Sequence, residues 1–448
     1  MRPLLRGEHA RDDPPADSAQ RALCPIEEST GGSSDRRWGT YARSMKKVDV
    51  LVCASGLHDR GALASLKKDL LRRIRAAGGL EIAETLQPSA DRLAAILVLT
   101  GGVERDVLKV IAQLPSPALL IAHPSHNSLP ASLEVLARIR QEGGEGRILF
   151  GSPETLAAEL KRELAVADAW DALRFSRVGL IGEPSDWLVA SDVDRAFLKG
   201  RLSIELVEIK IDELIDRIEA ESASKRTMSG FTRKAEEIKE PDGTALRGAA
   251  AIYKGLRGLV DEHRLAACTV RCFDLVQRLE NTGCYALSRL NDEGVPAGCE
   301  GDLQSLFSLY VAHLLTRQTA FMGNIAAVDV AERVVGIAHC TCPLSLTATY
   351  TIRSHFESGI GVGIAGAMPV GECTIFRLGG ERLDHLFVRE GEIEKAPFRD
   401  DLCRTQVRVR CNEPIDELLR APLGNHHILL AGRHGDTITR FFDRYLGS

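Results

Sequence analysis

The chain has 448 residues, of which 44% are hydrophobic and 27% are charged, and its formal net charge at pH 7 is -5. This length is enough for roughly two to four domains with cores of their own. A small negative net charge argues against a nucleic-acid surface, and no run of about 18 apolar residues predicts a transmembrane helix. We therefore expect a soluble, cytoplasmic protein with no nucleic-acid or membrane partner.

Eleven cysteines are scattered along the chain without a CxxC pair. An odd number of cysteines without a secretory signal is not typical of a disulfide framework. Cys340 and Cys342 would lie on one face of a strand, but two thiols alone do not make a zinc site. We interpret the cysteines as reduced, buried thiols.

Residues 1–44 differ in composition from the rest of the chain. They contain Pro14-Pro15, the run Gly31-Gly32-Ser33-Ser34 and many charges, without a hydrophobic period. This composition predicts a disordered tail, and the lack of an apolar stretch argues against a signal peptide. A strand-like run follows Met45, so we place the start of the first domain there.

Residues 45–175 alternate between short apolar strands and helical periods. The predicted strands are Val48–Ala54, Leu93–Leu99, Ala118–Ala122 and Arg147–Phe150, and the predicted helices are Ala62–Ala77 and Leu133–Gln141. This alternation predicts a parallel sheet that is covered by helices on both faces. Ligands bind at the carboxyl ends of the strands in such sheets. Thr100-Gly101-Gly102 and the segment His123–Ser128 follow two of these strands.

A second α/β domain is predicted over residues 176–332. Its first strand, VGLIG, follows Arg177, and further elements are predicted as a strand at Cys268–Phe273 and helices at Ala245–Glu262 and Phe307–Leu315. No GxGxxG fingerprint follows the first strand, so its glycine turn does not predict a nucleotide site.

From residue 333 to 448, helical periods give way to short strands separated by glycine turns, such as CTIFRLGG and TQVRVRC. This pattern predicts a β-barrel or sandwich of roughly 100 residues. A short helix is predicted near Phe441–Leu446. The predicted fold is therefore α/β, with two Rossmann-like α/β domains followed by a C-terminal β-barrel domain.

The densest cluster of polar residues is Gly298-Cys299-Glu300-Gly301-Asp302, which stands before a predicted helix. A carboxylate that is flanked by glycines at a helix start can approach a metal or a substrate closely. Asp302 would also suit the N-cap of that helix. Glu300 is not needed as a cap, so it is the stronger functional candidate.

Further candidates stand near the ends of predicted strands. They are Asn324, His339, His355, Glu357, Asn425, His426 and His427. Mixed oxygen and nitrogen donors suit Mn²⁺ or Mg²⁺ better than a structural zinc ion. His426 and His427 enter a strand together, so their side chains point to opposite faces and only one should bind a metal.

Four of these motifs resemble, in the same order, motifs of the L-fucose isomerase and L-arabinose isomerase superfamily. The run Ala297–Asp302 is similar to the segment that carries a metal-binding glutamate, and Phe321–Asn324 stands where the family has its second metal-binding carboxylate. Gly336–His339 resembles a segment with a metal-binding histidine. Gly424–His427 resembles the C-terminal metal-histidine motif. The resemblance extends from about Met45 to the C-terminus.

The resemblance implies a metal-dependent aldose–ketose isomerase that acts on a sugar or sugar derivative through a cis-enediolate. It implies Mn²⁺, or another divalent cation such as Mg²⁺ or Co²⁺, held by Glu300, Asn324 and either His426 or His427. Asn324 departs from the family's carboxylate, and a neutral amide should weaken the site. Two other functions stay open, namely a sugar-binding protein without turnover and a metal-dependent aldolase or lyase for a sugar acid.

The chemistry of such an isomerase needs a carboxylate that moves a proton between two carbon atoms. The catalytic candidates are Glu300, Asp302 and Glu357. The candidates for substrate binding are His123, His126, Asn127, His339, His355, Arg404 and Asn425. An arginine fork such as that of Arg404 or Arg353 suits a phosphate, sulfonate or carboxylate group.

The resemblance also implies an assembly. In the resembled isomerases, the first domain of a neighbouring subunit contributes to the active site, and the enzymes are trimers or hexamers. We therefore expect a homo-oligomer in which His126 or Asn127 contacts the substrate of a neighbour. The alternative is that Asn127 and Ser128 cap the helix that follows them, with His123 and His126 as loop residues.

Overall fold

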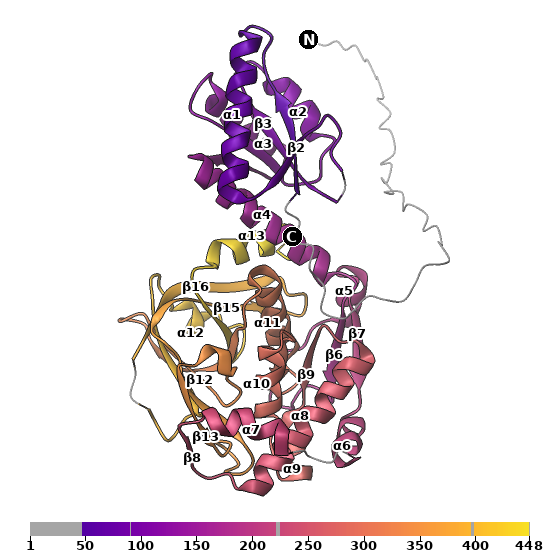
Figure 1. Ribbon diagram of the computed structural model, residues 1–448, viewed down its shortest axis with the longest axis vertical. Helices are drawn as coiled ribbons and strands as arrows, with labels where there is room; N and C mark the ends of the chain where they lie inside the picture. The colour runs from indigo at the N-terminus through magenta and orange to yellow at the C-terminus, as the bar shows by residue number, and fades with distance from the viewer. Residues whose placement is uncertain (1–46, 90, 221–224, 396–397, 448) are drawn as a thin grey trace, which may run out of the picture. The chain divides into compact units, whose positions relative to one another are not determined.

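The computed structural model describes residues 47–89, 91–220, 225–395 and 398–447 (Figure 1). The tail predicted at residues 1–44, and the domain start predicted at Met45, lie outside the described residues. No helix within the described part is long and apolar enough to cross a membrane.

The first sheet has five parallel strands in the order β2-β1-β3-β4-β5. Its strands are β1 (Lys47–Cys53), β2 (Glu81–Glu84), β3 (Leu93–Val98), β4 (Ala118–Ala122) and β5 (Gly146–Phe150). Its helices are α1 (Arg60–Gly78), α2 (Glu104–Ile111), α3 (Ser128–Gln141) and α4 (Pro153–Leu173). Along β1, Val48 and Val50 join one apolar cluster, and Leu51 and Cys53 join another. Apolar packing on both faces confirms the predicted parallel sheet.

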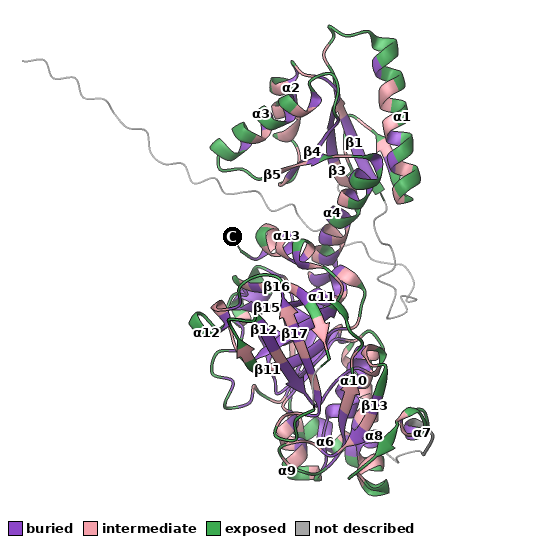
Figure 2. Cartoon of the chain, turned by 90° about the vertical axis from the view of Figure 1, so that its left-hand side faces the viewer, coloured by how far each residue is buried: buried purple, intermediate pink, exposed green. Residues whose placement is uncertain are grey.

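In the first sheet and its helices, the central strands are buried and the covering helices have exposed outer faces. Figure 2 shows the central strands β1, β3 and β4 as mostly buried and much of α1 as exposed. From β1, the chain adds β2 on one side of the sheet and then β3 on the other side, although all five strands stay parallel. A crevice forms at the carboxyl ends of the two strands where the order reverses in this way, here β1 and β3. Thr100-Gly101-Gly102 and the start of α3 lie near this crevice.

The second sheet has four parallel strands in the order β10-β9-β6-β7. Its strands are β6 (Arg177–Ile181), β7 (Glu205–Ile209), β9 (Ala267–Val270) and β10 (Ala297–Cys299). The helices that accompany it are α5 (Arg195–Gly200), α6 (Ile211–Ala220), α7 (Lys225–Lys234), α8 (Gly243–His263), α9 (Cys272–Leu279), α10 (Cys284–Asp292) and α11 (Leu303–Thr316).

One prediction for this region is wrong. Cys268–Phe273 is not a single strand, because β9 ends at Val270 and α9 begins at Cys272. A short apolar run does not distinguish a strand from the first turn of a buried helix. Cys272 and Leu275, three positions apart on α9, are both buried and give this helix its inner face.

Six antiparallel strands close into a barrel in the order β11-β12-β17-β16-β15-β18. They are β11 (Phe321–Asp329), β12 (Val334–His339), β15 (Gly371–Gly379), β16 (His385–Glu394), β17 (Thr405–Cys411) and β18 (His426–Ala431). The barrel confirms the β-rich character predicted for the C-terminal region. It also includes β11, which precedes residue 333, where we placed the start of that region.

The remaining elements precede, separate or follow the barrel strands along the chain. A small sheet in the order β14-β13-β8 consists of β8 (Glu237–Ile238), β13 (Thr349–Arg353) and β14 (Gly363–Ala367). A 3-10 turn (Leu344–Leu346), α12 (Glu417–Arg420) and α13 (Gly435–Tyr445) complete the described chain.

Helix α11 joins the second sheet to the barrel. It contacts β9 and β10 on one side and β11, β15 and β18 on the other (Figure 1). Nearly all of its residues are buried. The end of β10 and the start of β18 meet at the first turn of this helix, where Asp302 contacts His426.

Candidate active site

The chain turns sharply between β10 and α11. Glu300 and Gly301, the first two residues after β10, have φ angles of 63° and 75°. A Cβ at Gly301 would lie 2.6 Å from the carbonyl oxygen of Glu183, so only glycine fits there. A positive φ at a residue other than glycine costs roughly 1–3 kcal/mol and persists only where the surroundings hold it. One such contact is the hydrogen bond that the Ser185 backbone N–H donates to the Glu300 carbonyl, at 2.8 Å.

The Glu300 carboxylate is almost buried and has partners from distant parts of the chain. Trp187 Nε1 donates a hydrogen bond to Oε2 at 2.7 Å, and His426 Nε2 lies 3.5 Å from Oε1. Burial alone would raise the pKa of this carboxyl, but His426, His339 and Trp187 together lower it to about 2. Glu300 is therefore a carboxylate at neutral pH, with one oxygen directed at a histidine.

Asp302 holds the ring of His426, which is fully buried. His426 Nδ1–H donates to Asp302 Oδ2 across 2.9 Å. Nε2 of the same ring has no hydrogen-bond partner among the described residues. A carboxylate bonded to the far nitrogen is the arrangement that orients histidine ligands in metal sites.

The charge state of His426 depends on the two carboxylates. Burial disfavours a charged ring, but Asp302 and Glu300 outweigh burial and raise the pKa of His426 to about 9. At neutral pH the ring therefore carries a proton on both nitrogens, and a cation that bound to Nε2 would displace one of them.

Asp302 is the N-cap of α11, as the sequence indicated. Its Oδ1 accepts from the Ser305 backbone N–H at 2.7 Å, and its Oδ2 accepts from the Ser305 hydroxyl at 2.8 Å. The Arg377 guanidinium also lies 3.4 Å from Oδ2. Since the carboxylate is fully buried and bonded on both oxygens, the geometry favours an orienting role for Asp302 over direct proton transfer.

Cys299 and His339 add two donor atoms beside Glu300. One ligand atom from each of these three buried residues lies within 4.8 Å of the other two. The ring centroids of His339 and His426 are 5.4 Å apart. Burial and the charge of His426 lower the pKa of His339 to about 3, so this ring is neutral and its nitrogen can bind a metal. Oxygen, nitrogen and sulfur donors therefore converge at this point.

These residues line a cavity of about 30 Å³, which has room for one ion or water but not for a sugar. Asn324, His355 and Glu357, all predicted site residues, line the same cavity. The Asn324 side-chain oxygen accepts a hydrogen bond from Asn425 Nδ2 at 3.0 Å. Burial and the charge of Glu300 raise the pKa of Glu357, which makes this carboxyl easier to protonate than an exposed glutamate.

His427 lies on the opposite face of β18 from His426. Its ring is buried and packs edge-on against Phe387, with 5.2 Å between the ring centroids. Leu429, which is two residues further along and on the same face, belongs to an apolar cluster with Phe387. Of the two histidines that the sequence left open, His426 is therefore the one beside Glu300.

Arg404 is almost buried and is held by Ser354. Its Nε donates to the Ser354 carbonyl oxygen at 2.9 Å, and its guanidinium lies over the Phe356 ring at 5.7 Å from the centroid. Burial lowers the pKa of His355, and the charge of Arg404 lowers it further. Arg404 also lines a second cavity of about 910 Å³, together with Arg353.

The predicted residues of the first domain lie in a different place. His126 and Asn127 line a cavity of about 400 Å³, which shares no described lining residue with the Glu300 cavity. Both have positive φ angles, 55° and 57°. Asn127 stands at the N-cap of α3, but its side chain caps none of the described residues. His123 is buried, with Nε2 2.9 Å from the Leu99 carbonyl oxygen, as expected of a structural histidine.

Trp187 and Cys299, which lie beside Glu300, were not predicted as site residues. Trp187 stands on the loop after β6, at the carboxyl end of a parallel strand, which is where ligands bind in such sheets. This position was a usable signal. Cys299 stands directly before Glu300 in the sequence, but its contacts with His339 and with Cys272, whose sulfur lies 2.9 Å from that of Cys299, join residues that are remote in the sequence.

No model of a protein family matches this chain. The chain is 23% identical over 313 residues to a sulfoquinovose isomerase of Alkalicoccus urumqiensis, with 66% of this chain and 68% of that protein covered. It is 24% identical over 267 residues to a sulfoquinovose isomerase of Clostridium sp. (strain MSTE9), with 56% of this chain and 59% of that protein covered. The chain resembles sugar isomerases. Neither relative is named for L-fucose or L-arabinose, so that part of the resemblance stays a prediction.

Proposed function

We propose that this chain is a metal-dependent aldose–ketose isomerase whose substrate is a sugar with an anionic group. The similarity to two sulfoquinovose isomerases supports an isomerase that acts on sugars. The observation that carries the proposal is the buried group of donor atoms around Glu300. Beside this group lies His426, whose Nε2 has no hydrogen-bond partner among the described residues and is 3.5 Å from Glu300 Oε1.

The donors suit a divalent cation. Glu300, His339 and His426 would be the ligands, Asn324 would offer a neutral oxygen, and Asp302 would orient His426 from outside the ligand shell. Oxygen and nitrogen donors are compatible with Mn²⁺, Mg²⁺ and Co²⁺. Because two of the ligands would be histidine nitrogens, which bind transition-metal ions better than they bind Mg²⁺, we favour Co²⁺ or Mn²⁺ over Mg²⁺.

A cation bound there would polarise the substrate carbonyl and stabilise the charge that develops on it. Glu357 would move the proton between C1 and C2 of the sugar, by way of a cis-enediolate. Its raised pKa suits a carboxyl that must both accept and return a proton. His355 lines the same cavity and would contact the substrate.

The test is an assay with sulfoquinovose and with neutral aldoses as substrates, in which formation of the ketose is measured. We expect turnover of the sulfonated sugar, loss of turnover after EDTA treatment, and recovery with Mn²⁺ or Co²⁺. Turnover that survives complete metal removal would contradict the metal-dependent mechanism. Binding of sugar without any ketose would favour a sugar-binding protein, and retro-aldol fragments would favour an aldolase.

Arg404→Ala should weaken the binding of an anionic sugar. A hydrogen bond to a charged group contributes about 1.5–3 kcal/mol, so we expect KM for sulfoquinovose to rise roughly 10- to 100-fold. The KM of a neutral sugar should not change. The matched control is Arg353→Ala, since Arg353 lines the same cavity but is paired with Glu240 at 2.6 Å. If Arg404→Ala affects both sugars equally, Arg404 does not recognise the anion.

We also propose a homo-oligomer, a trimer or hexamer, in which His126 and Asn127 reach a neighbour's substrate. The separate cavity at the carboxyl end of the first sheet supports this arrangement. Light scattering should detect a trimer or larger species. Mixing His126→Ala subunits with Glu300→Gln subunits should restore part of the activity, because some sites would then combine two intact halves. A monodisperse, active monomer would rule out the shared site.

A further inference from the structure

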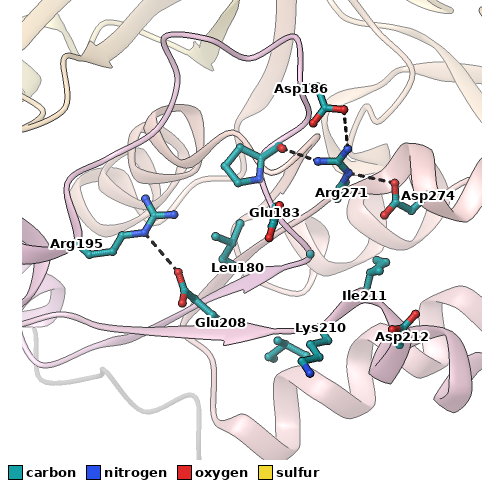
Figure 3. Close-up of a pocket in the computed structure, with 13 residues that line it drawn as sticks. Leu180, Glu183, Asp186, Arg195, Glu208, Lys210, Ile211, Asp212, Arg271 and Asp274 are labelled. Carbon is teal, nitrogen blue, oxygen red and sulfur yellow. Dashed lines mark hydrogen bonds and ion pairs between the residues drawn. The ribbon is translucent and has the colours of Figure 1, made fainter.

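The loop that follows β6, residues 182–187, is held from two sides. On one side it contacts the turn after β10, through Ser185 and Trp187 to Glu300 and through Glu183 to Gly301. On the other side it borders a cavity of about 860 Å³ at the carboxyl ends of β6, β7 and β9 (Figure 3).

Arg271 holds the loop from the cavity side. Its Nη1 donates to the Pro184 carbonyl oxygen at 2.7 Å, and its Nη2 lies 3.1 Å from Asp186 Oδ2. Its Nε donates to Asp274 on α9 at 3.1 Å. Figure 3 shows all three contacts, which radiate from one planar guanidinium. Such a group has its donors in a rigid fork, so it ties the loop to α9 in one geometry.

Trp187 is about half exposed, at 52%. One edge of its ring meets Phe273 at 4.9 Å between centroids, and Phe273 meets His355 at 5.7 Å. Phe273 and His355 both line the Glu300 cavity. The tryptophan ring thus extends an aromatic wall outward from a cavity that is itself too small for a sugar.

The hydrogen bond from Trp187 limits what Glu300 can do. The indole N–H is bonded to Oε2, whereas Oε1 faces His426 Nε2. Without the indole, the carboxylate could rotate and present either oxygen, or both, toward the histidines. The indole therefore selects one carboxylate oxygen as the donor to a shared cation. Because the N–H is bonded to the buried Glu300, the exposed part of the apolar ring is available to contact a ligand.

We infer that Trp187 is the positioning residue for Glu300, that its exposed ring forms part of the surface on which the sugar lies, and that Arg271 holds its loop in place. This inference rests on the proposed isomerase function. It adds a specificity and positioning role that neither composition nor motif indicated.

The first test compares two substitutions of Trp187. Trp187→Phe keeps an aromatic ring but removes the N–H, so kcat should fall about 10- to 100-fold while KM stays within about twofold. Trp187→Ala also removes the ring, and KM should rise about tenfold in addition. Thermal unfolding of both variants establishes that the fold is retained. A Trp187→Phe enzyme with wild-type kcat would overturn the inference.

The second test addresses the cavity side of the loop. Arg271→Met should lower kcat about threefold to tenfold, since the loop loses its contacts at Pro184 and Asp186. Arg195 is the matched control, because it lines the same cavity but contacts Asp192 and Glu208 instead of the loop (Figure 3). Arg195→Met should leave kcat unchanged. Equal losses in the two variants would contradict a specific role for Arg271.

A readout that is independent of turnover uses fluorine NMR of protein labelled with 5-fluorotryptophan. The chain has three tryptophans, and the resonance missing from Trp187→Phe identifies Trp187. Glu300→Gln should shift this resonance, and Mn²⁺ should broaden it, more than the resonance of Trp170, which is stacked on Tyr445. A Trp187 resonance that does not respond to Glu300→Gln would overturn the inference. A wild-type protein that converts no sugar would count against the proposed function instead, with the shift still expected.

Discussion

Glu300→Gln is expected to lower sugar isomerisation roughly 10³-fold and to weaken the binding of Mn²⁺ strongly. Glutamine keeps the shape of the side chain, and its carbonyl oxygen can still accept the hydrogen bond from Trp187. What it lacks is the negative charge, which both a divalent cation and the protonated ring of His426 need. The fold should therefore be retained, while metal binding and turnover are lost.

The measurements are kcat with the sulfonated sugar, metal content of the purified protein, and the midpoint of thermal unfolding. The matched control is Glu183→Gln, which removes a carboxylate whose side chain lies at the cavity on the other side of the loop (Figure 3). The control should keep its metal and its turnover. Near-normal turnover of Glu300→Gln in a metal-replete assay would be decisive evidence against the site described here.

The second large effect separates two neighbouring histidines. His426→Ala should lose most of the bound metal and reduce turnover at least about 10²-fold, because it removes a ligand whose orientation Asp302 secures. His427→Ala should keep the metal. It removes a buried ring packed on Phe387, so it should instead reduce the free energy of unfolding by about 2–5 kcal/mol.

Metal analysis and urea unfolding on both variants distinguish these outcomes. His426→Ala should reduce the metal content, whereas His427→Ala should reduce the free energy of unfolding. If His427→Ala loses the metal and His426→Ala keeps it, the cation lies on the face of β18 that carries His427 instead of beside Glu300. If both keep it, Glu300 and His339 need other partners.

Local pattern predicted the main buried strands of the α/β regions, although it did not separate β9 from the start of α9. β3 and β4 are continuous apolar runs because both faces of a parallel sheet are covered. β11 was harder to recognise, because Gly323 and the pair Ala326-Ala327 interrupt its alternation of apolar and polar residues. Its strand state depends on pairing with β12 and β18, which are separate in the sequence.

Local sequence patterns indicated the order of the α/β and β-rich regions and singled out Glu300, since glycines and a capping aspartate around one carboxylate are local signals. It did not decide between His426 and His427, because strand alternation states only that they point to opposite faces. The packing of α11 between the second sheet and the barrel determines which face of β18 meets β10. The same packing brings Trp187 to Glu300 across 113 positions of sequence. Contacts of that range depend on the closure of the whole fold, and no local pattern encodes them.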